Sequence, residues 1–144
     1  GARQGVRFQY PDAWELTDQP NDEGVVITVF GPETSFWTLS LFFDSPDPEF
    51  VLEQALDALR SEYDEFDTYP VAADLCQRPT SASDVDFVCM DVTSSAFLRS
   101  FQTEQFTALV FYQGTDLELE QTRKALDAIT ESLQCEPSEA DDDQ

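Results

Sequence analysis

The stretch of sequence that decides the fold is FTALVFYQGTDLELEQTRKALDAITESL, residues 106–133. Its first part, residues 106–112, is rich in aromatic and aliphatic residues, which predicts a strand. Thr115 and Glu118 follow at the spacing of a capping box, in which each side chain accepts a hydrogen bond from the other residue's backbone N–H. The stretch therefore predicts a strand followed by a capped amphipathic helix. The predicted buried face of this helix consists of Thr122, Ala125, Leu126, Ile129 and Leu133.

A second strand and helix precede this pair in the chain. Residues 36–43 predict a strand with both faces at least partly covered. Asp47 is placed to cap a helix whose first residue is Pro48, and the predicted buried face of that helix consists of Leu52, Ala55, Leu56, Leu59 and Tyr63. Further strands are predicted over residues 6–10, 14–17, 25–30, 66–75, 85–93 and 96–102, with turn residues over 18–24. Together these elements predict an α+β fold, an antiparallel β-sheet with helices packed on its faces.

Length and composition favour one domain. A chain of 144 residues with 41% hydrophobic residues has enough material for a single core, which buries roughly two-thirds of the surface that the unfolded chain exposes. Residues 137–144 are acidic and have too little apolar content to fold. We therefore expect a single domain over residues 1–136 and a disordered acidic tail over residues 137–144.

The charge of the chain excludes some partners. Thirty acidic residues face seven basic ones, which gives a formal net charge of −23 at pH 7. A nucleic-acid-binding surface needs a basic stripe that seven scattered cations do not supply, so we expect no nucleic-acid partner. Solvation in salty or cation-rich surroundings accounts for the excess of carboxylates, and recruitment of a basic protein partner is the alternative.

The residue types needed for most catalytic sites are scarce. The chain has no histidine, the commonest general base and a common metal ligand, and only one lysine, Lys124. The sequence contains no Walker loop, no G-x-G-x-x-G and no C-x-x-C. We therefore expect a non-enzymatic protein with no catalytic, cofactor-binding or metal-ligating residues. An acid-dependent hydrolase is a further hypothesis, which rests only on the abundance of carboxylates.

Three cysteines allow one disulfide with one thiol left over. A hairpin that turns at Ala82 and Ser83 would place Cys76 opposite Cys89, at a separation that a disulfide bridges. We therefore hypothesise a Cys76–Cys89 bridge and an extracytoplasmic location, in the periplasm, a lumen or at the cell surface. The alternative is three reduced cysteines in a cytoplasmic protein, and the redox state of Cys135 stays open in either case.

Membrane attachment is expected only through a segment that precedes this sequence. No stretch has the eighteen or more consecutive apolar residues of a transmembrane helix. The chain begins with GARQG rather than with methionine, which is typical of a processed form whose leader has been removed. An export signal or a lipoprotein anchor upstream is consistent with this beginning.

The motif FQYPDAW, residues 8–14, resembles the opening of the Mog1/PsbP-like superfamily, which includes PsbP-like and DUF1795-type domains. The order of the predicted elements agrees with that superfamily over nearly the whole chain. The resemblance implies an α/β/α sandwich and brings no common catalytic residue with it. Similar proteins include extrinsic photosystem II subunits, exported bacterial lipoproteins, a nuclear GTPase-binding protein and chaperones for secreted effectors.

Two functional hypotheses follow. The first is a non-enzymatic exported accessory or binding domain whose ligand and oligomeric state stay open. The second is a cytoplasmic adaptor or chaperone that binds an apolar segment of a partner protein through an aromatic sheet face. The candidate residues for that face are Phe87, Phe97 and Phe101. Arg99, which lies between the last two, is either an anchor for an anionic ligand or the partner of a nearby carboxylate.

Overall fold

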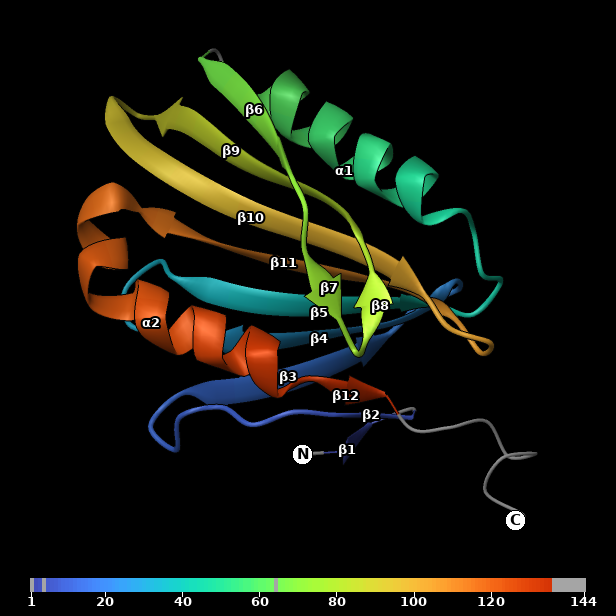
Figure 1. Ribbon diagram of the computed structural model, residues 1–144. Coiled ribbons are helices and arrows are strands. Elements are labelled where there is room, and N and C mark those ends of the chain that lie inside the picture. Colours follow the sequence, from blue (N-terminus) through green and yellow to red (C-terminus); the bar gives the residue numbers. More distant parts are fainter. Residues whose placement is uncertain (1, 4, 64, 136–144) are drawn as a thin grey trace.

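The computed structural model describes residues 2–3, 5–63 and 65–135. Its centre is a seven-stranded antiparallel sheet with the strand order β3-β4-β5-β11-β10-β9-β6. Helix α1 (Pro48–Glu62) lies on one face of this sheet and helix α2 (Asp116–Ser132) on the other (Figure 1). The predicted α+β class is therefore confirmed. The strands of the sheet are β3 (Glu15–Pro20), β4 (Gly24–Phe30), β5 (Phe36–Phe42), β6 (Phe66–Val71), β9 (Ser81–Cys89), β10 (Val92–Gln102) and β11 (Thr107–Thr115).

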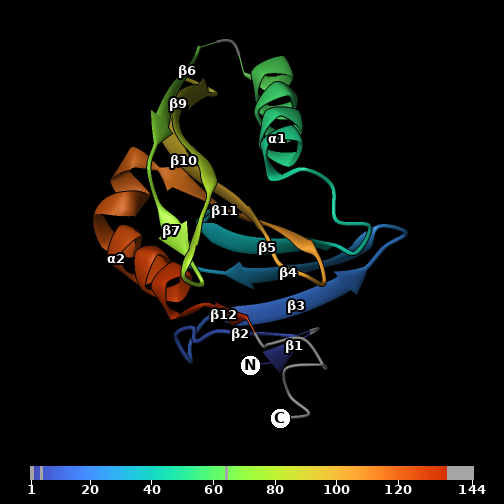
Figure 2. The same cartoon turned by 45° about the vertical axis from the view of Figure 1, so that its right-hand side comes forward.

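Two small sheets complete the described structure. Strands β1 (Ala2–Arg3), β2 (Val6–Arg7) and β12 (Gln134–Cys135) form a three-stranded sheet, in which Val6 pairs with Cys135. This sheet lies next to the edge strand β3, as Figure 2 shows. Strands β7 (Asp74–Leu75) and β8 (Arg78–Pro79) form a separate hairpin. The N-terminal strands are thus joined to the segment that follows α2.

Alternation along the strands creates two cores. In β5, Trp37 and Leu39 point to the α2 side, while Phe42 packs on the α1 side. The α2-side core also contains the aromatic residues of the N-terminal segment and of β10, and the α1-side core is smaller. Because a helix covers each face of the sheet, the strands carry apolar residues on both faces.

Both predicted helix starts are confirmed. The Thr115 hydroxyl accepts from the backbone N–H of Glu118 at 3.1 Å, and the Glu118 carboxylate accepts from the N–H of Thr115 at 2.9 Å. Asp47 caps α1 by accepting from the N–H of Glu49 at 3.1 Å, and Pro48 is the first helical residue. Helix caps can be predicted from sequence because the donor and the acceptor lie within one helical turn.

Some strand boundaries differ from the prediction. Residues 18–20 belong to β3 and not to a turn. The predicted strand over residues 85–93 is interrupted at Met90 and Asp91, which form a two-residue turn with φ values of 52° and 66°. Such turns usually carry Asn-Gly or Asp-Gly, so the Met-Asp pair gave no turn signal. The predicted acidic tail, residues 137–144, lies outside the described residues.

Candidate functional site

The predicted aromatic binding face does not exist as an exposed surface. The side chains of Phe87, Phe97 and Phe101 are only 3%, 4% and 1% exposed. Phe87 belongs to the core beneath α1, and Phe97 and Phe101 belong to the core on the α2 side. The prediction was wrong because a period-two pattern shows which residues share a face, and it does not show which face a helix covers.

Arg99 is held by a neighbouring strand. Its Nη1 atom lies 2.9 Å from a carboxylate oxygen of Asp84 and also donates to the carbonyl of Ser83 at 3.3 Å. The Arg99 side chain is largely buried, with 13% of its surface exposed, and the Asp84 side chain is 30% exposed. Of the two roles considered for Arg99, the structure shows the partner of a nearby carboxylate.

The predicted hairpin on which the Cys76–Cys89 pairing depended is also wrong, because the structure has no turn at that place. Ala82 and Ser83 lie inside the continuous strand β9, so the chain does not turn there. Cys76 instead occupies the tip of the β7–β8 hairpin, and its Sγ atom lies 2.9 Å from the Sγ atom of Cys135. Cys89 packs against the α1-side core, whereas the other two cysteines pack against the α2-side core.

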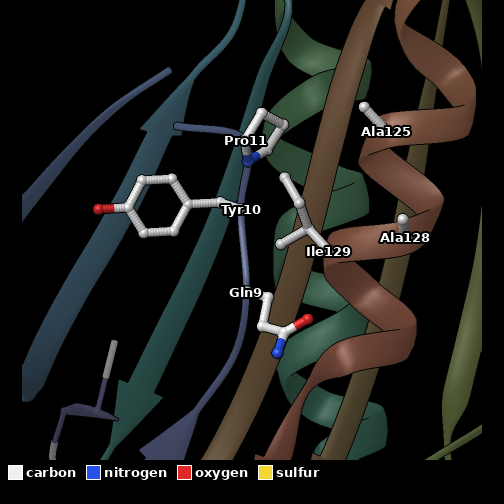
Figure 3. A pocket seen from close by; sticks show the side chains of 6 residues that line it. All are labelled: Gln9, Tyr10, Pro11, Ala125, Ala128 and Ile129. Atoms are coloured by element: carbon white, nitrogen blue, oxygen red, sulfur yellow. The ribbon is translucent and has the colours of Figure 1, made fainter. Parts of the chain in front are cut away.

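The structure contains a groove that was not predicted from the sequence. It lies between the segment that leads from β2 to β3 and the exposed side of α2, and its volume is about 380 Å³. Ala125 and Ala128 supply small side chains along α2, and Ile129 lies between the helix and the segment (Figure 3). We call this hollow the α2 groove, and its lining residues are Gln9, Tyr10, Pro11, Ala125, Ala128 and Ile129.

The N-terminal wall of the α2 groove is held in place at several points. The backbone N–H of Gln9 donates to the hydroxyl of Ser132, in the last turn of α2, at 2.8 Å. Phe8 is buried, and its ring centre lies 4.9 Å from that of Trp37. The N–H of Trp14 closes a turn by donating to the carbonyl of Pro11 at 3.0 Å. These contacts preorganise the wall, since neither end of the segment can move without breaking them.

The position of Trp14 depends on Gly31, which lies in the connection between β4 and β5. A Cβ atom at Gly31 would lie 3.1 Å from the Trp14 ring, which is closer than ordinary carbon–carbon contact. In the FQYPDAW motif, Phe8 lies in the core and Trp14 packs against it, whereas Gln9, Tyr10 and Pro11 line the α2 groove. The motif and Ala125, a small residue on the predicted buried face of the helix, were the available sequence signals, but nothing in the sequence indicated that they meet.

The chemistry of the α2 groove suits binding. Its lining residues carry one amide and one phenol as polar side-chain groups, and the Tyr10 ring points away from α2 (Figure 3). No carboxylate, amine or thiol is among the residues that line it. A groove of this kind can take up a compact apolar group.

A second hollow, of about 230 Å³, is acidic. It is lined by Glu65, Asp67, Asp86 and Asp116 among others, and the Ser95 hydroxyl lies 3.0 Å and 2.9 Å from carboxylate oxygens of Asp86 and Asp116. Within the part of the chain that the structure describes, no three Asp, Glu or Cys side chains are grouped so that they could hold a metal ion. None of the described helices is long and apolar enough to cross a membrane.

Comparison with known proteins shows a shared fold. At the level of sequence, no family model and no curated protein matches this chain. Among solved structures, it is similar to LpqN, a protein involved in cell envelope biogenesis of Mycobacterium tuberculosis, with a TM-score of 0.59 and 16% identity over 92% of this chain and 83% of LpqN.

A protein from Bacteroides thetaiotaomicron VPI-5482 is also similar, with a TM-score of 0.61 and 12% identity over 94% of this chain and 46% of that one. At these identities the likenesses concern the fold, and the resemblance to the Mog1/PsbP-like superfamily stays a prediction. The chain therefore shares its α+β fold with a protein of cell envelope biogenesis.

Proposed function

We propose that this chain is a non-enzymatic accessory domain of the cell envelope that binds a protein partner outside the cytoplasm. In this proposal, the α2 groove receives one apolar side chain of the partner. The observation that carries the proposal is the groove itself, a preformed apolar hollow of about 380 Å³. That volume lies at the lower end of the ~300–1,000 Å³ range typical of ligand sites.

The charge of the chain defines the partner further. A net charge of −23 attracts cationic molecules and repels anionic ones at low ionic strength. The partner segment is therefore an apolar residue flanked by basic residues. The anionic surface accelerates the encounter, and burial of the apolar side chain provides affinity that survives added salt.

The envelope location rests on fold likeness and on the cysteines. LpqN is described as involved in cell envelope biogenesis, and its similarity to this chain extends over 92% of the residues. The Mog1/PsbP-like superfamily, which residues 8–14 resemble, includes exported bacterial lipoproteins. Two cysteines with adjacent sulfur atoms are consistent with an oxidising compartment. The alternative hypothesis, a cytoplasmic adaptor that binds through an aromatic sheet face, is not supported, because the aromatic residues of that face are buried.

A titration followed by nuclear magnetic resonance tests the proposal. The probes are two short peptides with a central leucine, one flanked by lysines and the other by glutamates. We expect the lysine peptide to shift the amide signals of Gln9, Ala125 and Ala128, and the glutamate peptide to bind at least about tenfold more weakly. Shifts confined to residues outside the α2 groove would contradict the proposal.

The matched variants are Ala128→Trp and Ala58→Trp. Both alanines are exposed on a helix, but only Ala128 lines the α2 groove. An indole at position 128 fills the hollow, so we expect Ala128→Trp to abolish the lysine-dependent shifts. Ala58→Trp on α1 should leave them unchanged, and equal binding by both variants would overturn the assignment of the groove.

A further inference from the structure

Two cysteines that are far apart in sequence meet beside the end of α2. Cys76 and Cys135 are 59 residues apart, and their Sγ atoms lie 2.9 Å from each other. This is closer than the ~3.5–4.0 Å at which two non-bonded carbon atoms meet, although sulfur is the larger atom. The two sulfur atoms need to approach each other by only about 0.9 Å in total to reach the length of a covalent S–S bond.

The two cysteines lie on short elements outside the seven-stranded sheet. The β7–β8 hairpin forms its own two-stranded sheet, and within the described residues its backbone has no ladder with the seven-stranded sheet. The strand β12 has two residues, and among the described strands it pairs only with β2. A covalent link between residues 59 positions apart closes a long loop in the unfolded chain, and the loss of conformational entropy in the unfolded state stabilises the folded one.

The thiols are reachable and chemically poised for oxidation. Both are half-buried and line a hollow of about 470 Å³ together with Gln77, Glu131, Leu133 and Gln134. The hydrogen bond with Cys135 lowers the pKa of the Cys76 thiol against the opposing effect of burial, and the charge of Arg78 lowers it further. The same hydrogen bond and burial raise the pKa of the Cys135 thiol. Cys76 also lies at the tip of the β7–β8 hairpin beside the exposed residues Gln77 and Arg78, so we assign the first attack to its thiolate, the reactive form of a thiol.

We infer that Cys76 and Cys135 form a disulfide that ties the β7–β8 hairpin to β12. Because β12 pairs with β2 and Ser132 binds Gln9, the bridge also stabilises the N-terminal wall of the α2 groove. The pairing replaces the Cys76–Cys89 bridge that the sequence suggested. It goes beyond the proposed function, because it assigns a covalent modification whatever the groove binds.

The oxidant is a low-molecular-weight disulfide such as oxidised glutathione. The Cys76 thiolate attacks one sulfur of the oxidant, which forms a mixed disulfide and releases one glutathione thiol. The Cys135 thiol loses its proton and attacks the Cys76 sulfur, which releases the second glutathione. Two protein thiols thus lose two electrons and two protons in total, and the oxidant gains them.

The test is peptide mapping by mass spectrometry after incubation of the purified chain with oxidised glutathione. We expect the intact mass to fall by two hydrogen atoms and a digest to contain Cys76 linked to Cys135. Cys89 should be the only cysteine that an alkylating reagent modifies without prior reduction. Three alkylated cysteines, or a linked peptide that contains Cys89, would overturn the inference.

Two variants make the test specific. Cys89→Ser should still lose two hydrogen atoms on oxidation, whereas Cys76→Ser should not. For the wild-type chain, reduction should lower the Tm by about 10 °C, and it should not change the Tm of Cys76→Ser. If Cys76→Ser does not fold, comparison of the oxidised and reduced Cys89→Ser chain gives the same information.

The inference and the proposed function can fail separately. Mapping of the cysteines uses no ligand, so its outcome does not depend on the α2 groove. The lysine-peptide titration, run on the reduced and on the oxidised chain, reports groove binding in either redox state. A linked peptide without groove binding would refute the proposed function and leave the disulfide standing. Groove binding without a linked peptide would refute the disulfide and leave the groove assignment standing, with the envelope location supported by the fold likeness alone.

Discussion

The two faces of the sheet hold their helices in different ways. On the α2 side, directional hydrogen bonds join the helix to the sheet: Trp37 Nε1 donates to the Thr130 hydroxyl at 2.9 Å, and the Tyr112 hydroxyl donates to Asp127 at 2.7 Å. The Ser35 and Thr122 hydroxyls lie 3.1 Å apart and form a third bond. On the α1 side, the buried faces of Val51, Leu52, Leu56 and Leu59 meet aliphatic and aromatic residues of the sheet.

This difference shows that the interactions that stabilise a helix on the sheet are not the same as those that fix its position. Apolar contact stabilises a helix on a sheet but tolerates small sliding motions, because it has no preferred direction. A buried hydrogen bond fixes one atom relative to another, and its loss leaves an unpaired polar group. We therefore infer that α2 is the more precisely placed helix, which agrees with its role as one wall of the α2 groove.

The largest expected effect comes from removing core side chains on the two sides. Leu126 of α2 is fully buried, and Leu56 of α1 is 6% exposed. We expect Leu126→Ala to lower the free energy of unfolding by about 3–5 kcal/mol and Leu56→Ala by about 2–3 kcal/mol. Urea unfolding followed by circular dichroism measures both values. An equal or larger loss for Leu56→Ala would remove the distinction between the two cores.

A smaller effect is expected from the hydrogen bond between Trp37 and Thr130. Thr130→Val keeps the shape of the side chain and leaves the buried indole N–H of Trp37 without its acceptor. We expect a loss of about 1–3 kcal/mol in the free energy of unfolding. The control, Thr130→Ser, keeps the hydroxyl and should lose less. If the valine variant were as stable as the serine variant, the bond would contribute nothing to the placement of α2.

The smallest expected effect is a dependence on alkaline pH. Burial and the hydrogen bond to Asp127 raise the pKa of Tyr112 above its ordinary value of 10.0. Since the folded state holds this proton more strongly, its contribution to stability is complete below pH ~10 and is lost as the pH rises above that value. Between pH 8 and pH 11, we expect the wild-type chain to lose about 1 kcal/mol more than Tyr112→Phe.

The control for this measurement is Tyr63→Phe at the end of α1. Burial and the charge of Glu62 also raise the pKa of Tyr63, but its ring stacks on Phe87 near the solvent-accessible end of the helix. The measurement is urea unfolding at the two pH values and constant ionic strength. The loss of unfolding free energy between these pH values should differ less from that of the wild-type chain for Tyr63→Phe than for Tyr112→Phe. A larger effect for Tyr63→Phe would reverse the comparison.

The success of the sequence predictions depended on how local the interactions are. The caps at Asp47 and Thr115 were predicted, because each is decided by residues close in sequence. The turn at Met90 and Asp91 was missed, since both residues adopt positive φ without glycine or asparagine. The candidate site was missed more completely, because it joins residues 9–11 to α2 across more than a hundred positions.

The sequence by itself determined the α+β class, both helix starts and the anionic charge of −23. These properties follow from composition, from alternation along a strand and from contacts within one helical turn. Tertiary structure alone decided that Phe87, Phe97 and Phe101 are buried and that Cys76 meets Cys135. The physical reason is that both outcomes depend on which helix covers which face and on how two short elements dock. Packing of the whole chain sets those arrangements, and the pattern of any one segment does not.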